Sequence, residues 1–196
     1  MRGSRFIHLL SIVLLIFMVQ CSKQEQAPYV DGLYFEYDVV KTFKIREEFM
    51  LGMEGRRSSA KVKYKVQASD DGYEINKTVD NATIFFIAAD EVILVDKYGK
   101  NKELGNYFKL WLPVKGLEIG DAVYANFRVD RKERWKEWDV MVCIDKSAPL
   151  AEFYFDSETG FFVGMKAGFV AVISGSQERE EVLINTNAGI NVAKVE

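Results

Sequence analysis

The sequence predicts an all-β domain built on one antiparallel sheet, and three observations lead to this fold class. Apolar and polar residues alternate with a period of two over many short segments, which is typical of strands that bury one face. Turn-forming residues separate these segments at regular intervals. No long amphipathic helix is indicated after the first 20 residues. We therefore expect about ten strands in one strongly curved sheet over residues 29–196, with a β-sandwich or a closed barrel as alternatives.

The first half of the domain shows this alternation from its start. In Tyr29–Val40, the side chains of Leu33, Phe35 and Tyr37 fall on one face. Lys41–Leu51 continues the pattern, although its two adjacent glutamates also fit a helical turn. Four further strands are predicted, at Ala60–Gln67, Tyr73–Val79, Thr83–Ala88 and Glu91–Asp96.

The second half is punctuated by charged or glycine-containing turns. Strands are predicted at Tyr107–Trp111, Ala122–Val129, Trp135–Asp145, Val170–Ser174 and Glu181–Asn185. We interpret the charged stretches Asp130–Glu133 and Gln177–Glu180 as turn tips. Arg128–Trp138 as a whole is then a solvated hairpin rather than a nucleic-acid or glycan site.

The clearest hairpin joins Phe153–Phe155 to Phe161–Val163 through the turn Asp156–Gly160. Asp156 is suited to accept hydrogen bonds from the turn backbone, and Gly160 to adopt the left-handed conformation. Glycines recur every four residues from Gly160, a spacing that packs membrane helices in other proteins. Because the flanks here are strand-like, these glycines are interpreted as bends or bulges.

The N-terminus carries an export signal. Arg2 and Arg5 precede Phe6–Val19, an apolar run shorter than the ~20 residues that span a bilayer as a helix. Cys21 and a polar stretch follow. With Met18-Val19-Gln20-Cys21 at the processing point, this layout resembles a bacterial lipoprotein signal.

The resemblance implies a signal peptide over residues 1–20, cleavage before Cys21 and lipidation of its thiol. Residues 21–28 would form a disordered, lipidated tether to the membrane. Gln20 stands where the family prefers a small residue, so an ordinary cleaved signal and an uncleaved anchor remain alternatives. Ser22 resembles outer-membrane sorting, which places the domain on the periplasmic or surface side if the cell has two membranes.

Composition argues against several classes of function. Removing Arg2 and Arg5 leaves 24 basic against 29 acidic residues, so the net charge of the mature chain is −5 and disfavours nucleic-acid binding. The one histidine, His8, lies in the signal, which excludes Ser-His-Asp and Cys-His catalysis and histidine-based metal sites. With Cys21 lipidated, Cys143 is unpaired and is interpreted as a buried strand residue. We expect no catalytic residue, no metal and no cofactor.

Aromatic residues make up 13% of the chain and provide the positive signal. The runs Phe85-Phe86, Phe153–Phe155 and Phe161-Phe162 are apolar on both faces of a predicted strand. Two interpretations follow: both faces are buried, or one face packs on the core and the other lines an apolar cavity. The sequence does not assign the ligand-binding residues.

The strand series as a whole resembles that of β-rich envelope lipoproteins; it opens with Gly32-Leu33-Tyr34-Phe35-Glu36-Tyr37 and ends in the Tyr154–Gly160 hairpin. Some of those lipoproteins are similar to the LolA/LolB superfamily of lipoprotein carriers and receptors. That resemblance implies a half-barrel that holds lipid on its concave side. No helix to plug the open side and no arginine for acyl-chain release is found, so no functional residue is carried over. The predicted function is non-catalytic binding of an apolar ligand, a lipid or an envelope protein. The alternative is a surface scaffold or adhesion-type lipoprotein acting through protein contacts.

Overall fold

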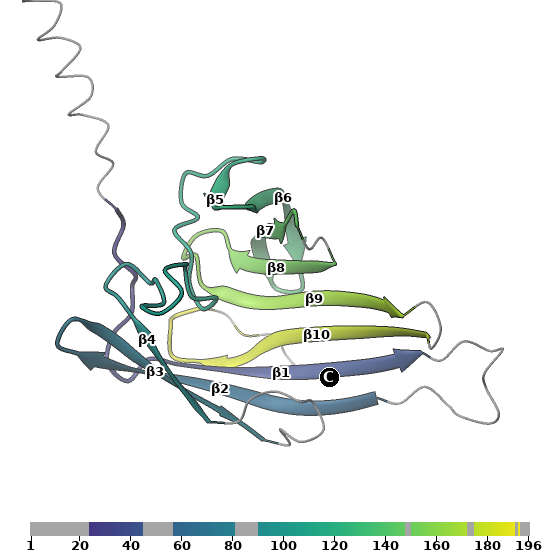
Figure 1. Ribbon diagram of the computed structural model, residues 1–196, viewed down its shortest axis with the longest axis horizontal. Coiled ribbons are helices and arrows are strands. Elements are labelled where there is room, and N and C mark those ends of the chain that lie inside the picture. Colours follow the sequence, from purple (N-terminus) through teal and green to yellow (C-terminus); the bar gives the residue numbers. More distant parts are fainter. Residues whose placement is uncertain are drawn as a thin grey trace, which may run out of the picture.

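A computed structural model describes residues 24–44, 57–80, 90–147, 150–171, 175–190 and 192. These residues form strands, turns and connections without a helix, so the all-β class is confirmed for them (Figure 1). None of them forms a helix that could cross a membrane. The predicted signal over residues 1–20, Cys21 and the predicted strand Thr83–Ala88 lie outside the described residues.

Ten strands pair into a single antiparallel sheet, as the sequence predicts. Their order across the sheet is β4-β3-β2-β1-β10-β9-β8-β7-β6-β5. The strands are β1 (Tyr34–Lys44), β2 (Arg57–Ser69), β3 (Gly72–Val79), β4 (Glu91–Val95), β5 (Ala122–Tyr124), β6 (Phe127–Trp135), β7 (Trp138–Asp145), β8 (Ala151–Asp156), β9 (Phe162–Ala171) and β10 (Gly175–Thr186).

The first and last strands meet in the middle of the sheet. β1 pairs with β10, which joins the meander β1–β4 to the meander β5–β10 (Figure 1). β4 and β5 are the two edges and do not pair with each other, so the sheet is open and the closed-barrel alternative is wrong.

Strict alternation defines two faces. In β1, the side chains of Phe35, Tyr37 and Val39 are buried. The residues of β2 that lie opposite them, such as Tyr64 opposite Phe35, are buried too. The intervening residues of β2 are exposed. We call the face that carries Phe35 and Tyr64 the inner face, and the opposite one the outer face.

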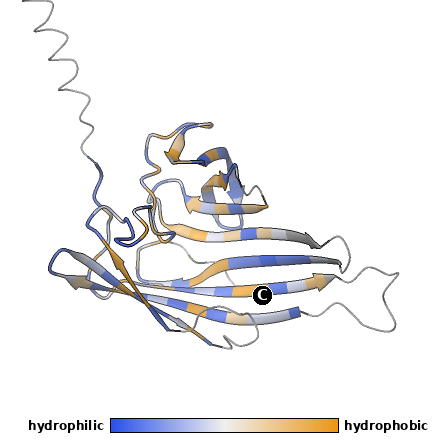
Figure 2. Ribbon diagram, in the orientation of Figure 1, coloured by the Kyte–Doolittle hydropathy of each residue, from blue (hydrophilic) through white to orange (hydrophobic). Residues whose placement is uncertain are grey.

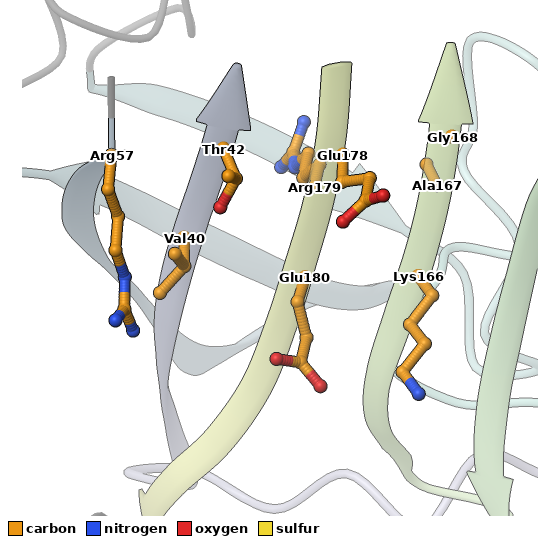
Figure 3. A pocket seen from close by; sticks show the side chains of 9 residues that line it. All are labelled: Val40, Thr42, Arg57, Lys166, Ala167, Gly168, Glu178, Arg179 and Glu180. Carbon is orange, nitrogen blue, oxygen red and sulfur yellow. The ribbon is translucent and has the colours of Figure 1, made fainter. Parts of the chain in front are cut away.

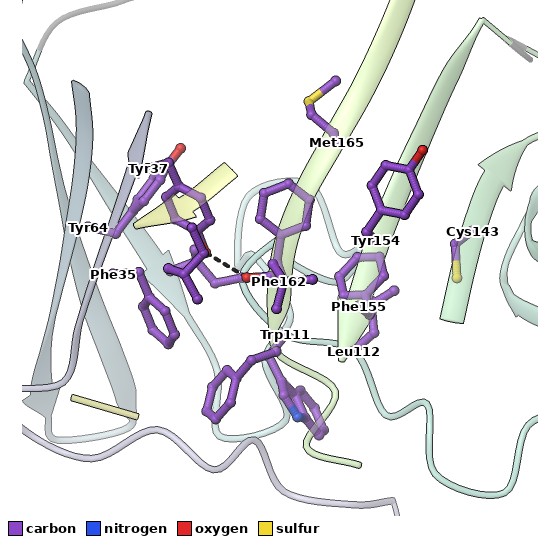
Figure 4. Close-up of a cluster of buried hydrophobic side chains, with 14 of the residues drawn as sticks. Phe35, Tyr37, Tyr64, Trp111, Leu112, Cys143, Tyr154, Phe155, Phe162 and Met165 are labelled. Carbon is purple, nitrogen blue, oxygen red and sulfur yellow. Dashed lines mark hydrogen bonds between the residues drawn. The ribbon is translucent and has the colours of Figure 1, made fainter. Parts of the chain in front are cut away.

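The connection over residues 96–121, which joins the two edge strands, lies on the inner face. Leu110, Trp111 and Leu112 are buried there (Figure 4). The Phe162 N–H donates to Leu110 O at 3.0 Å, and the Trp111 indole Nε1–H donates to Thr159 O at 3.0 Å. The predicted strand Tyr107–Trp111 is therefore wrong. Its backbone makes isolated bridges, from Tyr107 to Lys100 within the connection and from Trp111 to Phe161 beside the β8–β9 turn, instead of joining the sheet.

The outer face is buried as well over β6 to β9. The rings of Trp135 and Tyr154 stack at 4.2 Å, and Trp138 stacks on Trp135 at 5.7 Å. Tyr154 and Phe155 are consecutive and both buried, one on each face (Figure 4). The run Phe153–Phe155 thus contributes to two apolar layers, as the first of the two interpretations expects.

Gly164 belongs to this packing. An added Cβ would lie 2.4 Å from the Trp135 ring. The register between β8 and β9 shifts beside it, because Tyr154 pairs with Gly164 while Phe155 pairs with Phe162. The interpretation of this glycine as a bulge marker is confirmed.

Two predicted turn tips are wrong. β6 runs through Asp130–Glu133, and the chain reverses at residues 136–137, where Lys136 has a φ of 52°. Gln177–Glu180 lies inside β10, whose first half is visibly hydrophilic (Figure 2). In both strands the charges are stabilised by partners within the fold, for example Arg131 with Glu152 at 3.0 Å, so polarity does not mark a turn.

The tether is not free along its whole length. Ala27 is buried, and its N–H donates to Lys97 O at 3.0 Å. Tyr29 is buried next to Tyr73, with ring centroids 5.4 Å apart. The expectation of a disordered segment up to residue 28 is therefore wrong at its C-terminal end, where the chain docks on the connection.

Candidate functional site

The feature that stands out on the inner face is a buried carboxylate. Glu181 of β10 has an exposed fraction of 0% and lies opposite Val39 of β1. Lys109 Nζ lies 2.7 Å from one carboxylate oxygen, and Arg179 Nη2 lies 3.2 Å from the other. A charge removed from water needs such partners, since burying it alone would cost several kcal/mol.

Two different elements position these three residues. Arg179 and Glu181 are two apart in β10, so both side chains point to the inner face. Figure 3 shows Arg179 on the opposite side of β10 from Glu178 and Glu180. Lys109 comes from the connection over residues 96–121, and hydrogen bonds of its two neighbours fix its position. The Phe108 N–H donates to Gly99 O at 2.8 Å, and Leu110 O accepts from the Phe162 N–H of β9. The site forms only when the connection is docked.

Three aromatic rings surround the Lys109 ammonium group. Nζ lies 5.1 Å from the ring centroid of Phe162, 5.2 Å from that of Tyr64 and 5.8 Å from that of Tyr37. Burial on its own would lower the pKa of Lys109, but Glu181 and Tyr64 together raise it above its usual range. Lys109 is therefore a charged lysine held by a carboxylate and by cation–π contacts.

A cavity of about 440 Å³ adjoins this cluster. Residues of both edge strands line it: Glu91 and Ile93 come from β4, and Tyr124 comes from β5. Its size is within the range of small-molecule sites, roughly 300–1,000 Å³. The other lining residues come from β2, β3, β10 and the connection: Val62, Tyr64, Lys77, Asn101, Leu104, Asn106, Tyr107, Phe108, Lys109 and Arg179.

The walls combine apolar surface with an excess of positive charge. Lys77 and Glu91 neutralise each other at 3.0 Å. Lys109 and Arg179, in contrast, share the single carboxylate of Glu181. Among the described residues, the buried Nε of Arg179 has no hydrogen-bond partner. The cluster thus carries a net charge of about +1 beside an apolar pocket.

A second cavity, of about 580 Å³, lies over β1, β2, β9 and β10 (Figure 3). On the outer face, side chains of both charges surround it, among them Arg57, Lys166, Glu178 and Glu180. Among the described residues, no aromatic side chain lines this cavity, whereas Tyr64, Tyr107, Phe108 and Tyr124 line the one on the inner face. The inner-face cavity is therefore the better candidate site.

None of the residues that line this cavity was predicted as a site residue from the sequence. Cys21 lies beyond the described residues, and no ligand-binding residue was assigned from the sequence. Cys143 is fully buried in β7, as predicted, and burial raises the pKa of its thiol to about 12. Within the described ranges, no group of three or more His, Cys, Asp or Glu side chains could hold a metal ion.

Arg179 was missed because Gln177–Glu180 was interpreted as a turn. Glu181 and Lys109 were assigned to the predicted strands Glu181–Asn185 and Tyr107–Trp111, and no local pattern shows that these two side chains meet. A signal was present: Arg179 and Glu181 have the same parity as Leu183, which faces the core. Once this stretch is assigned to a strand, Arg179 and Glu181 are expected to point to the same face as Leu183. Two charged side chains on the core-facing side of a strand indicate a candidate binding site. No family model, curated protein or solved structure matches the chain.

The buried tyrosines predict alkaline unfolding. Burial raises the pKa values of Tyr29, Tyr37, Tyr64 and Tyr154 above the unfolded value of about 10. Groups of this kind contribute their full stability below pH 10 and lose it as the pH rises from there toward the folded pKa values. We expect the free energy of unfolding to fall above about pH 10, with phenolate absorbance rising together with loss of circular dichroism.

The same titration in urea, where all tyrosines ionise near pH 10, is the control. Ionisation of these tyrosines with an intact spectrum would contradict their burial.

Proposed function

We propose that this protein is a non-catalytic lipoprotein of the cell envelope, anchored through Cys21, that binds an apolar ligand, a lipid or an envelope protein on the inner face of its sheet. The observation that carries the proposal is the 440 Å³ cavity with aromatic and aliphatic walls. The absence of any histidine after His8 supports a binding role over acid–base catalysis.

The proposal includes a half-barrel architecture of the LolA/LolB type. Its support is that Ile93 of one edge strand and Tyr124 of the other line the same cavity, which requires the sheet to bend around it. The connection over residues 96–121, which buries Leu110, Trp111 and Leu112 on the inner face, would take the place that plugging helices occupy in the carriers. A ligand would enter past Leu104, which is exposed at the rim.

The first test uses the mature chain, residues 21–196 with Cys21→Ser, purified from cells without an acyl anchor. Native mass spectrometry with lipid extraction should detect a stoichiometric apolar ligand. Ile93→Trp, which fills the cavity, should remove the bound mass. Val92→Trp is the matched control, because its side chain, next along the strand, is 59% exposed and does not line the cavity.

Circular dichroism and thermal unfolding would first establish that both variants fold. An unliganded mass for the parent chain would contradict ligand binding and favour the scaffold alternative. One observation already supports that alternative: Val92 and Leu94 expose apolar side chains on β4, an edge strand of the open sheet. Exposed apolar edges are common protein-contact sites.

The anchor is tested separately. Replacing Cys21 with alanine removes the thiol that the lipid would occupy, so the domain should leave the membrane fraction or remain unprocessed. Membrane fractionation and the mass of the product measure both effects, with Ser22→Ala as the control. A Cys21→Ala chain that is still processed and still sediments with membranes would exclude lipidation.

A further inference from the structure

We propose that the ligand of the inner-face cavity is an amphiphile with one acidic headgroup, a carboxylate or a phosphate, that pairs with Arg179. The inference rests on the proposed function and goes beyond it by naming the chemical class of the ligand. The apolar tail would lie against Ile93, Tyr107 and Phe108, which line the same cavity.

The charge balance of the cluster points to an anion. Glu181 places one oxygen on Lys109 and the other on Arg179, at 2.7 and 3.2 Å. A guanidinium group carries five N–H donors, and a single one of them meets Glu181. The side chain of Arg179 is 29% exposed and lines the cavity, so its other donors are within reach of a ligand. A carboxylate or phosphate would neutralise the excess charge and pair with the exposed part of the guanidinium group.

A further cation strengthens the preference. Lys41 of β1 is the cross-strand partner of Arg179, so both side chains lie on the inner face. Burial and the positive charge of Arg179 lower the pKa of Lys41, consistent with two cations on the same face of neighbouring strands. An anion that pairs with Arg179 would offset part of this positive charge.

The arrangement also disfavours other ligands. The headgroup of a cationic amphiphile would meet Arg179 and be repelled. A neutral alcohol or glyceride would leave the guanidinium donors beside it without an ionic partner. An unpaired buried donor loses its hydrogen bonds to water without replacement, which weakens binding. Free inorganic anions would gain the ionic contacts but not the apolar ones.

The experiment compares probes that differ in the headgroup alone. Dodecanoate, dodecyl phosphate, dodecanol and inorganic phosphate are titrated into the mature chain with Cys21→Ser by calorimetry, below the micelle concentration. At least one acidic amphiphile should bind roughly 10- to 100-fold more tightly than dodecanol, the factor that charge-assisted hydrogen bonds supply. The stronger of the two identifies the headgroup as a carboxylate or a phosphate.

The variant Arg179→Gln should reduce this preference to below about 3-fold, because the acidic headgroup loses its charged partner. Arg57→Gln is the matched control, since Arg57 is an exposed arginine of β2 that lines the outer-face cavity. If Arg179→Gln does not fold, the comparison of headgroups on the parent chain still decides. Arg179→Lys, which keeps the charge but loses the planar fork, should then give an intermediate preference.

The outcomes separate the two proposals. Equal affinity for dodecanoate, dodecyl phosphate and dodecanol would overturn the acidic headgroup and leave the apolar-ligand function standing. Binding of inorganic phosphate as tightly as dodecyl phosphate would overturn the amphiphile in favour of a free anion. Failure of every amphiphile to bind would overturn the apolar-ligand version of the proposed function and leave the binding of an envelope protein.

Discussion

Replacing Gly160 with valine is expected to lower the free energy of unfolding by roughly 2–5 kcal/mol. Gly160 has a φ of 76°, a left-handed conformation that strains a β-branched residue. A Cβ would also lie 2.2 Å from Leu112 O, a backbone atom of the connection over residues 96–121. The substitution therefore strains the β8–β9 turn and displaces the connection at once.

Urea denaturation followed by tryptophan fluorescence measures this loss. Gly116→Val is the matched control, because Gly116 has a similar φ of 82° but no heavy atom within 4 Å of the position that a Cβ would take. That variant should show the conformational strain alone, about 1–2 kcal/mol. The difference between the two variants reports the clash with the connection, and equal losses would contradict the close packing of Leu112 on the turn.

The Gly160 variant has a second consequence, for ligand binding. Two carbonyls of the β8–β9 turn bind the connection: Thr159 O accepts from the Trp111 indole N–H, and Gly160 O accepts from the Leu112 N–H at 3.0 Å. Those contacts hold the segment that carries Lys109. We expect weakened ligand binding in addition to lower stability, whereas Gly116→Val should bind normally.

Replacing Lys109 with methionine is expected to destabilise the protein by roughly 3 kcal/mol. Methionine retains most of the apolar stem, so the main change is the loss of the cation that lies 2.7 Å from the fully buried Glu181. Removing one partner of a buried ion pair costs about 3–5 kcal/mol, and the lower end applies because Arg179 still contacts the carboxylate.

The double variant Lys109→Met with Glu181→Gln should recover much of that loss, because no uncompensated carboxylate remains buried. Lys132→Met is the control for removing a lysine charge, since its ion pair with Glu118 is exposed and should contribute less than about 1 kcal/mol. Chemical denaturation of the four proteins decides. A Lys109→Met loss no larger than that of Lys132→Met would show that Glu181 is solvated.

Local patterns predict much of the sheet. Phe35 and Tyr37 alternate with polar neighbours, and the turn before Gly160 carries Asp156, whose carboxylate accepts the Thr159 N–H at 2.8 Å as expected. Alternation and turn chemistry act between residues a few positions apart, so they are visible in the sequence. The class of fold, the strand count and the burial of Cys143 follow from such patterns.

The same local patterns do not predict the strands that carry many charged residues. Arg131 lies in a segment that looks like a turn tip, because its partner Glu152 is distant in the sequence. Glu181 adjoins another such segment, and its partner Lys109 is more distant still. Only the tertiary fold reveals that these charges are neutralised within the sheet. The pairing of β1 with β10, which sets Arg179 beside Lys41, is equally invisible to local periodicity.

The sequence by itself determined the all-β class and the hairpin at Gly160, since both depend on residue type or short-range spacing. The anchor at Cys21 and a role without histidine catalysis remain predictions from the sequence. The tertiary structure decided that the sheet is open and that the connection over residues 96–121 lies on its inner face. It also decided that Lys109 meets Glu181 beside a cavity. These contacts join segments about 70 residues apart and depend on how apolar faces pack, which no local pattern encodes.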